Sequence, residues 1–260
     1  MTEAGLRYEA AAGRRASMLA TLRSVGFVSV ADLARQLGVS QMTIRRDLHA
    51  LENGGHVRLV HGGASLTPGA LRSSGFPEDD EAEARERVAA CAVSLVGETD
   101  TIAIDAGATG HAVARALPET FDGCVISHSL PVLQFLSVGR VERVVALGGE
   151  LLPGRQAFVG PTTEAATAQL RVRTLFLCPG GIDARGMYAE SPAEASLQRQ
   201  LIDIADQVVV VVTGAAFRAW APARIAPLGR LTGLVTDHRP PAEVAVALRR
   251  VGVVPHVVSR

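Results

Sequence analysis

The pattern of apolar and polar residues over positions 29–38 predicts a short helix that buries one face. Apolar residues recur there at the spacing of a single helical stripe: Val30, Leu33, Ala34 and Leu37. Ser29 comes just before the stripe and Asp32 follows three residues later, as in helices capped by a serine side chain. Gly38 suits a left-handed stop at the other end of this helix.

A second helix is predicted after the short turn at 38–40, with Ser40 as its candidate cap. Ile44, Leu48 and Leu51 form its inward stripe. Its opposite face carries Met42, Thr43, Arg45, Arg46 and His49. A helix that reads DNA turns hydrogen-bond donors toward the major groove, where arginines fork to guanine or clamp phosphates. Taken alone, the arginine pair also fits a solvated helix face.

Residues 56–61 alternate between polar and apolar types, which predicts a small strand beside the two helices. Phe27 and Val28 are its predicted partners, and the strands together would form a wing. Capped helices, a short turn and a wing in succession favour a winged helix-turn-helix over a solvated face. The predicted DNA-contacting residues are Ser40, Gln41, Met42, Thr43, Arg45, Arg46, His49, Arg58 and His61.

This segment resembles the DeoR family of bacterial transcription regulators. The resemblance rests on the run from Val39 to Leu48, which contains Thr43-Ile44-Arg45-Arg46-Asp47, and on the downstream run 61–64, which reads His-Gly-Gly-Ala. It implies a winged-helix repressor or activator that binds a double-stranded DNA operator. It also implies a C-terminal domain that senses a small metabolite, usually a sugar phosphate.

Charge is distributed unevenly along the chain, although the formal net charge is zero. The first 64 residues hold eight arginines against five acidic residues, whereas residues 65–260 hold eighteen against twenty-one. The N-terminal part therefore favours nucleic acid as a partner and the remainder does not. All 26 basic residues are arginine, so Schiff-base chemistry at a lysine is excluded.

The remaining composition excludes several classes of protein. Cys91, Cys124 and Cys178 lie far apart without a CxxC spacing, so we expect neither a disulfide framework nor a metal site, and no cofactor. The N-terminus lacks the pattern of a secretory signal, and the five valines at 208–212 are too short a run to span a bilayer. We expect a cytoplasmic protein without a membrane partner.

The chain is predicted to contain a DNA-binding domain at 1–64, a linker at 65–81 and a larger domain at 82–260. The linker mixes Pro, Gly, Ser and charged residues without periodicity. The larger domain alternates short apolar strands with helices, which predicts a mostly parallel, Rossmann-like α/β sheet covered on both faces. The predicted strands are 101–105, 124–127, 141–147, 174–178, 208–213, 233–236 and 254–258; the predicted helices are 82–96, 110–117, 130–138, 162–170, 193–205 and 242–251.

The ends of these strands are where a ligand is expected, because sheets of this kind bind ligands outside their carboxyl edge. The loop 105–110, Asp-Ala-Gly-Ala-Thr-Gly, follows a strand and precedes a helix. Its small residues can wrap an anion with backbone N–H groups while Thr109 adds a hydroxyl. A plain strand-to-helix turn is the alternative interpretation.

Further segments resemble the sensor domain of the family, at 127–131, 147–150, 159–161 and 181–183. His128 stands where the family usually has asparagine, and it is either an effector contact or an ordinary hydrogen-bonded residue. The predicted effector-contacting residues are Asp105, Gly107, Ala108, Thr109, Gly110, Ser127, His128, Ser129, Gly148, Gly149, Gly181 and Thr213.

Two segments depart from the family pattern. Gly180 replaces an acid, and the run 212–218 lacks the usual aspartate, serines and lysine, with Thr213 and Ala216 in their place. The resemblance therefore implies a reduced polar wall and an effector other than an ordinary sugar phosphate, or one bound more weakly. Substitute cations are available at Arg155, Arg185 and Arg218, although each also fits a surface position.

Two other functions remain as alternatives. The larger domain resembles sugar-phosphate isomerases and deaminases, but an enediol mechanism needs a positioned carboxylate base and a charge stabiliser. Gly180, Thr213 and Ala216 supply neither, and Glu190, Glu194 and Asp183 fit salt bridges. The other alternative is a regulator whose larger domain serves only oligomerisation. The favoured function is a homo-oligomeric, effector-controlled repressor of a carbohydrate or related catabolic operon, with no enzymatic activity.

Overall fold

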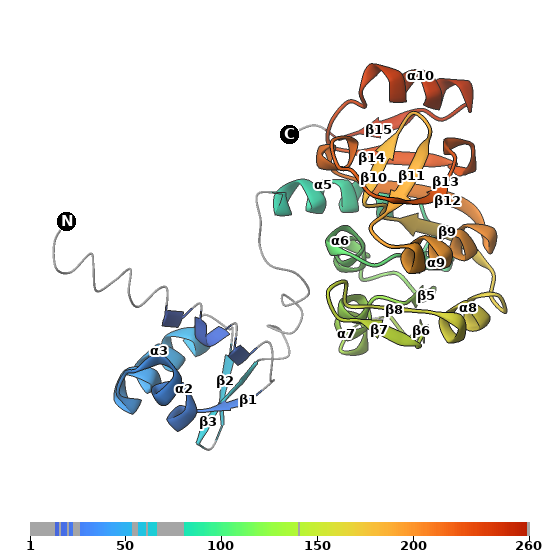
Figure 1. Cartoon of the computed structure of the whole chain (residues 1–260). Helices are drawn as coiled ribbons and strands as arrows, with labels where there is room; N and C mark the ends of the chain where they lie inside the picture. The colour runs from blue at the N-terminus through green and yellow to red at the C-terminus, as the bar shows by residue number, and fades with distance from the viewer. Residues whose placement is uncertain are drawn as a thin grey trace. The chain divides into compact units, whose positions relative to one another are not determined.

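The computed structural model describes residues 14–15, 17–19, 21–22, 27–53, 57–60, 62–66, 81–139 and 141–258. The chain divides into two compact units, residues 1–74 and 75–260 (Figure 1). We call them the head and the body. Predicted site residue His61 lies outside the described residues, as do 67–80 of the predicted linker.

The head contains the two predicted helices with the predicted caps. Helix α2 (Val30–Leu37) begins at Ser29, whose Oγ accepts the Asp32 N–H at 3.0 Å, and ends at Gly38 with φ of 64°. Helix α3 (Gln41–Asn53) follows, with the Thr43 N–H donating to Ser40 Oγ at 3.2 Å. Their apolar stripes meet in one core that includes Leu33, Ile44 and Leu48, all fully buried.

The wing differs from the prediction in its pairing. Strand β1 (Phe27–Ser29) pairs with β3 (Gly63–Leu66), and β3 lies between β1 and β2 (Val57–Val60). The predicted pairing of Phe27 and Val28 with 56–61 is therefore wrong, because the chain turns at Gly62 (φ 81°) and returns β3 into that place. The predicted boundary at residue 64 falls inside β3. A Cβ on Gly63 would overlap the Val28 carbonyl oxygen, so this close approach requires glycine.

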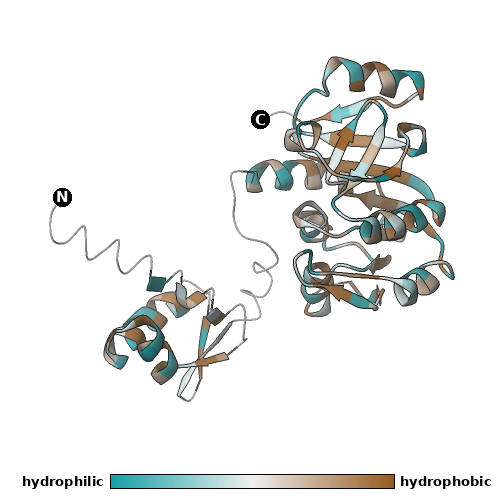
Figure 2. Ribbon diagram, viewed as in Figure 1, coloured by the Kyte–Doolittle hydropathy of each residue, from teal (hydrophilic) through white to brown (hydrophobic). Residues whose placement is uncertain are grey.

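The body is built on one seven-stranded sheet in which every neighbouring pair is parallel. Its order is β15 (Pro255–Val257), β14 (Gly233–Thr236), β12 (Ala205–Val212), β9 (Val172–Leu177), β4 (Thr101–Ile104), β5 (Cys124–Ser127) and β6 (Arg143–Ala146). The apolar runs read from the sequence form its interior, and the valines of β12 from Val208 to Val212 are buried. Figure 2 colours the ribbon by hydropathy. The predicted parallel α/β class is thereby confirmed.

Helices cover both faces of this sheet (Figure 1). On one face, α5 (Ala82–Val93), α6 (Ala108–Ala116) and α7 (Leu130–Ser137) bury residues such as Val88, Val113 and Val132 against the strands. On the other, α9 (Pro192–Asp203) and α10 (Ala242–Arg250) contribute Leu201 and Leu248, and α8 (Pro161–Thr167) packs against α9.

The body also contains short antiparallel strands that the sequence did not predict. They lie in the segments that follow β6, β9 and β12. One hairpin pairs β7 (Glu150–Leu152) with β8 (Ala157–Val159). A three-stranded sheet joins β10 (Gly181–Asp183), β11 (Gly186–Ala189) and β13 (Ala223–Ala226), and 3-10 turns η1 (Gly214–Phe217) and η2 (Leu228–Arg230) complete the fold. Among the described residues, no helix is long and apolar enough to cross a bilayer, and no cluster of side chains has the make-up of a metal site.

Candidate functional site

The outward face of α3 is the candidate DNA-contacting surface. It exposes Gln41, Met42, Arg45, Arg46 and His49, and Ser40 is exposed in the preceding turn. Thr43 is half-buried and its hydroxyl shares a hydrogen bond of 3.0 Å with Ser40 Oγ. Arg58 is exposed on β2 of the wing. The described members of the predicted DNA-contacting set therefore lie on α3, the turn before it and the wing.

The opposite side of α3 fixes the helix to the head. Asp47 is buried there, and its Oδ2 accepts a charged hydrogen bond from Arg14 Nε at 2.6 Å. Ile44 and Leu48 are fully buried beside it. This anchoring orients Arg45 and Arg46 outward, which is the arrangement needed to present two guanidinium groups to a groove or to phosphates.

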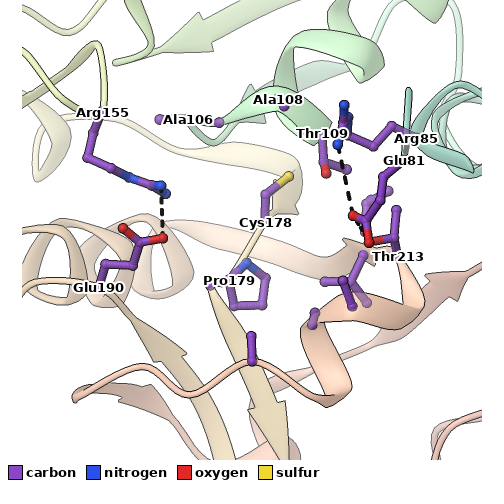
Figure 3. Close-up of a pocket in the computed structure, with 17 residues that line it drawn as sticks. Glu81, Arg85, Ala106, Ala108, Thr109, Arg155, Cys178, Pro179, Glu190 and Thr213 are labelled. Carbon is purple, nitrogen blue, oxygen red and sulfur yellow. Dashed lines mark hydrogen bonds and ion pairs between the residues drawn. The ribbon is translucent and has the colours of Figure 1, made fainter. Parts of the chain in front are cut away.

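A second candidate site lies in the body, where the order of the sheet reverses. Strands β4 and β9 are neighbours at the centre of the sheet. After β4 the chain adds β5 and β6 toward one edge, and after β9 it adds β12, β14 and β15 toward the opposite edge. Ligands of open α/β sheets bind outside the carboxyl ends of two such strands. A pocket of about 330 Å³ opens there (Figure 3). It is lined by residues 106–109, 178–180, 211–213, 215, 216 and 219, and by Glu81, Arg85, Arg155 and Glu190.

The first wall of this pocket is the start of α6. Gly107 takes φ of 106° as the N-cap residue, and the first amides of the helix have no acceptor within it. A Cβ on Gly110 would overlap the Asp105 carbonyl oxygen, so the helix approaches β4 closely only because this residue is glycine. Thr109 adds a hydroxyl to the wall. Backbone donors and the positive end of a helix dipole together favour an anionic group.

Arg85, Glu81 and Thr213 form a polar cluster beside that wall. The Thr213 hydroxyl donates to Glu81 Oε2 at 2.8 Å, and Arg85 Nη1 lies 3.9 Å from the same oxygen. The Arg85 side chain is only 11% exposed. Glu81 is the N-cap residue of α5 and Thr213 follows β12, so the cluster joins the start of the body to the end of a central strand.

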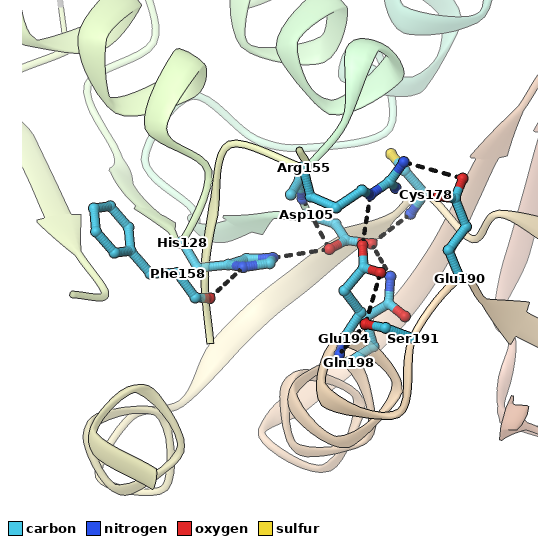
Figure 4. A network of polar contacts seen from close by, with 10 residues as sticks. Asp105, His128, Arg155, Phe158, Cys178, Glu190, Ser191, Glu194 and Gln198 are labelled. Atoms are coloured by element: carbon cyan, nitrogen blue, oxygen red, sulfur yellow. Dashed lines mark hydrogen bonds and ion pairs between the residues drawn. The ribbon is translucent and has the colours of Figure 1, made fainter. Parts of the chain in front are cut away.

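Arg155 forms the opposite wall, from the turn between β7 and β8. Its Nε donates to the buried Glu194 Oε1 at 2.7 Å, and its Nη1 donates to Glu190 Oε1 at 3.1 Å (Figure 4). Burial acts to lower the pKa of Arg155, but the carboxylates of Glu194 and Glu190 outweigh it and raise that pKa. The guanidinium therefore stays charged, and its charge is already balanced by acids.

Asp105 is a structural residue behind the pocket. It is 1% exposed, and its Oδ2 accepts the Cys178 N–H at 2.9 Å and Gln198 Nε2 at 2.8 Å. Its Oδ1 accepts the Ala106 N–H and meets His128 Nε2 at 2.9 Å. His128 is equally buried and binds the Phe158 carbonyl oxygen through Nδ1 at 3.0 Å. These contacts favour the ordinary hydrogen-bonded role for His128.

Several predicted effector contacts do not line this pocket. Ser127 donates to the Ile104 carbonyl oxygen and accepts the Ser129 N–H, which makes both serines part of the buried loop after β5. Gly148 and Gly149 lie between β6 and β7, where the Gly148 carbonyl oxygen accepts the Thr163 hydroxyl at 2.9 Å and a Cβ on Gly149 would overlap that hydroxyl. Gly181 begins β10, close to the Ala219 carbonyl oxygen. The full set outside the lining is Asp105, Gly110, Ser127, His128, Ser129, Gly148, Gly149 and Gly181, and effector contact by these residues stays a prediction.

The pocket brings together Gly107, Ala108, Thr109 and Thr213 from the predicted set. Of the three substitute cations, Arg155 lines it, whereas Arg185 pairs with Asp183 and Arg218 is exposed elsewhere. The sequence analysis missed Glu81 and Arg85. Their spacing of four residues at the start of a predicted helix was the available signal, but it does not reveal that the helix begins beside the strand ends.

Comparison with known proteins identifies both units. A family model described as the DeoR-like helix-turn-helix domain matches residues 14–68, and one described as the DeoR C terminal sensor domain matches residues 80–238. The chain belongs to the DeoR family. It is therefore a DNA-binding transcriptional regulator with a sensor domain, and the predicted family and function are confirmed at this level.

Curated relatives of this family match nearly the whole chain. The transcriptional repressor AccR of Agrobacterium fabrum is 30% identical over 233 residues, covering 86% of this chain and 88% of the relative. A putative aga operon transcriptional repressor of Escherichia coli O157:H7 is 29% identical, covering 92% and 91%. The glycerol-3-phosphate regulon repressor of Escherichia coli K12 is 28% identical, covering 90% and 94%.

Solved structures give weaker likenesses. Ribose 5 phosphate isomerase A from Neisseria gonorrhoeae has a TM-score of 0.40 and 14% identity, covering 53% of this chain and 54% of that one. The full-length sorbitol operon regulator SorC from Klebsiella pneumoniae has a TM-score of 0.32 and 13% identity, covering 76% and 88%. The assignment to the family rests on the sequence matches.

Proposed function

We propose that the protein represses a carbohydrate-related operon and that a small metabolite bound in the body controls its affinity for DNA. The relatives described above are named repressors, one of an aga operon and one of a glycerol-3-phosphate regulon, which supports this direction of control. The operator is double-stranded DNA, and α3 enters its major groove. The protein acts in the cytoplasm as a homo-oligomer.

In this proposal the two exposed arginines of α3 supply most of the groove and backbone contacts. Arg45 and Arg46 are held outward by the buried Asp47 side of the helix. Arg58 on the wing adds a contact to the phosphates, whereas Ser40 acts mainly as the helix cap. Each good arginine contact contributes about 1–3 kcal/mol to binding or to discrimination between bases.

The pocket where the sheet reverses is the proposed effector site, and it is the observation that carries the proposal. An anionic group of the effector binds against the first turn of α6, Thr109 and the buried Arg85. Small side chains line the rest of the cavity, with Arg155 and Glu190 at the far wall. The buried arginine beside an open helix end favours this function over a body that serves only oligomerisation.

The same pocket does not favour catalysis. Its two lining carboxylates are already engaged, Glu190 with Arg155 and Glu81 with Thr213 and Arg85. Neither is positioned as an unpaired base, and Gly180 and Ala216 contribute no acid or base. We therefore propose that the protein binds its effector without turnover, and that isomerase and deaminase assays with sugar phosphates detect none.

A thermal-shift screen of the full chain tests the effector site. The panel contains phosphorylated and free sugars, polyols and nucleosides, because a ligand that binds only the native state raises its stability by mass action. We expect a stabilising compound that carries an anionic group and differs from the common hexose and pentose phosphates. Its effect should be lost in Thr109→Val, and equal stabilisation of that variant would contradict the assigned wall.

A further inference from the structure

The carboxylate of Glu81 occupies the part of the pocket where an anionic effector is expected. Its Oε2 accepts a hydrogen bond from the Thr213 hydroxyl at 2.8 Å and lies 3.9 Å from Arg85 Nη1 (Figure 3). Arg85 and Thr213 also line the pocket, next to the first turn of α6. A glutamate side chain therefore uses donors that a bound phosphate or carboxylate would use.

The Glu81 carboxylate and an anionic effector compete for the same donors, Arg85 and the Thr213 hydroxyl. Glu81 lines the pocket beside Arg85, Thr109 and Thr213, so an anionic group bound against those donors lies close to its carboxylate, and like charges that close repel. The lining contains two arginines and two glutamates, so its formal charge cancels while Glu81 stays in place. Moving Glu81 aside leaves Arg85 as a charge-assisted donor for the incoming group.

We propose that Glu81 is an internal competitor of the effector, which holds Arg85 and Thr213 until an anionic ligand displaces it. This inference rests on the proposed function, because it assumes that the pocket binds the effector. It adds the means by which binding changes the protein. In this proposal the Glu81 carboxylate is the group that moves when the effector binds.

Glu81 lies at the start of α5, so its displacement would act on the segment that joins the body to the head. Glu81 is the N-cap residue of α5, and its carbonyl oxygen accepts the Arg85 N–H at 2.9 Å. The chain that precedes it leads back to the DNA-binding head. The acids that neutralise Arg155, in contrast, are Glu194 in the first turn of α9 and Glu190 just before that helix, more than a hundred residues further along the chain. Of the two carboxylate clusters at this pocket, only the Glu81 cluster adjoins the segment that connects the two units.

The test compares Glu81→Gln with wild type, using inorganic phosphate as the probe and calorimetric titration of the full chain. Glutamine keeps the length of the side chain and an oxygen that accepts from Thr213, but it removes the charge. We expect phosphate to bind at least about five-fold more tightly to the variant, because the competing anion is gone. Unchanged or weaker binding would overturn the proposal.

Glu83→Gln is the matched control, since Glu83 lies on the same helix, is 94% exposed and does not line the pocket. It should bind phosphate as wild type does. If Glu83→Gln tightens binding as much as Glu81→Gln, a general charge effect explains the result and the competitor role is wrong.

Arg85→Met separates this inference from the proposed function. Loss of phosphate binding in Arg85→Met, with no gain in Glu81→Gln, would refute the competitor role and leave the effector site standing. Equal binding by wild type and Arg85→Met, or no binding by any variant, would refute the site and the inference together.

Hydrogen exchange tests the displacement itself. Saturating phosphate should speed exchange of the Arg85 amide, which donates to the Glu81 carbonyl oxygen, by several-fold in wild type. Glu81→Ala, which lacks the contact with Thr213, should exchange rapidly there with or without phosphate. An unchanged wild-type rate at saturation would contradict the link between the pocket and the start of α5.

Discussion

The carboxylate of Asp105 joins four segments of the body through N–H donors. It binds the Ala106 and Cys178 amides, Gln198 of α9 and His128 of the loop after β5. The sequence placed Asp105 at the end of a strand and predicted an effector contact for it, whereas the structure shows its carboxylate engaged by these four partners. Residue type and strand end can be read from the sequence, whereas the direction of a side chain depends on loops that meet only in the folded sheet.

Asp105→Asn should destabilise the body although the two side chains have nearly the same shape. Each carboxylate oxygen faces two nitrogens in the folded protein, so the amide NH2 of asparagine would oppose donors in either orientation. We expect the free energy of unfolding to fall by about 1–3 kcal/mol or more, as for buried polar groups left unpaired. Urea denaturation followed by circular dichroism measures it. Exposed Asp122→Asn is the control, and equal stabilities would refute the structural role.

At the scale of helices and strands, the sequence predicted the strands that are continuous apolar runs and the helices that have recognisable caps. The strand at 233–236 matches β14 and the valine run matches β12, because strands buried on both faces are continuously hydrophobic. The caps Ser29, Gly38 and Ser40 fixed the helices of the head. The strands β7, β8, β10, β11 and β13 were missed because each is short and also lies outside the alternation of strands with helices from which the other short strands were predicted.

The site was predicted only where it follows directly from such elements. The start of α6 was found from a strand followed by small residues, and Thr213 from the end of β12. Glu81 and Arg85 join them because α5 packs across the same face of the sheet. That packing depends on tertiary structure, and no local pattern in residues 81–85 indicates it.

The α3 element carries a direct prediction about DNA. Arg45→Ala and Arg46→Ala should each weaken operator binding by about 1–3 kcal/mol, because each removes a groove or phosphate contact. The operator is first selected from a random pool of duplexes, and affinity is measured by fluorescence anisotropy. Arg35→Ala is the matched control, since Arg35 is an exposed arginine of the same head on α2. Wild-type affinity in both α3 variants, with intact circular dichroism, would refute the assignment of α3 to the groove.

At the scale of the whole molecule, charge and function divide between the two units. The head, residues 1–74, has four more basic than acidic residues and the body four fewer. A single head therefore neutralises few phosphates, and electrostatic affinity grows with the number of such contacts. The body contains the sensor domain that the family match identifies. The chain therefore joins a DNA-binding head of low net charge to a sensor domain.

This weak charge leads us to expect a dimer or tetramer on repeated half-sites, because linked heads gain affinity through effective concentration. Light scattering coupled to size exclusion, on the free protein and on its DNA complex, measures the assembly. A monomer in both states would contradict this expectation.

The central claim is that a small molecule in the pocket between β4 and β9 controls binding of DNA by α3. Its most direct test is an anisotropy titration of the selected operator by the full chain, with and without the compound found in the thermal-shift screen. The account predicts that the compound raises the Kd of wild type at least about ten-fold. It predicts no change for the Arg85→Met, Thr109→Val double variant, which should still bind DNA as wild type does. An equal shift of Kd in the double variant, or no shift in wild type at saturating compound, would contradict it.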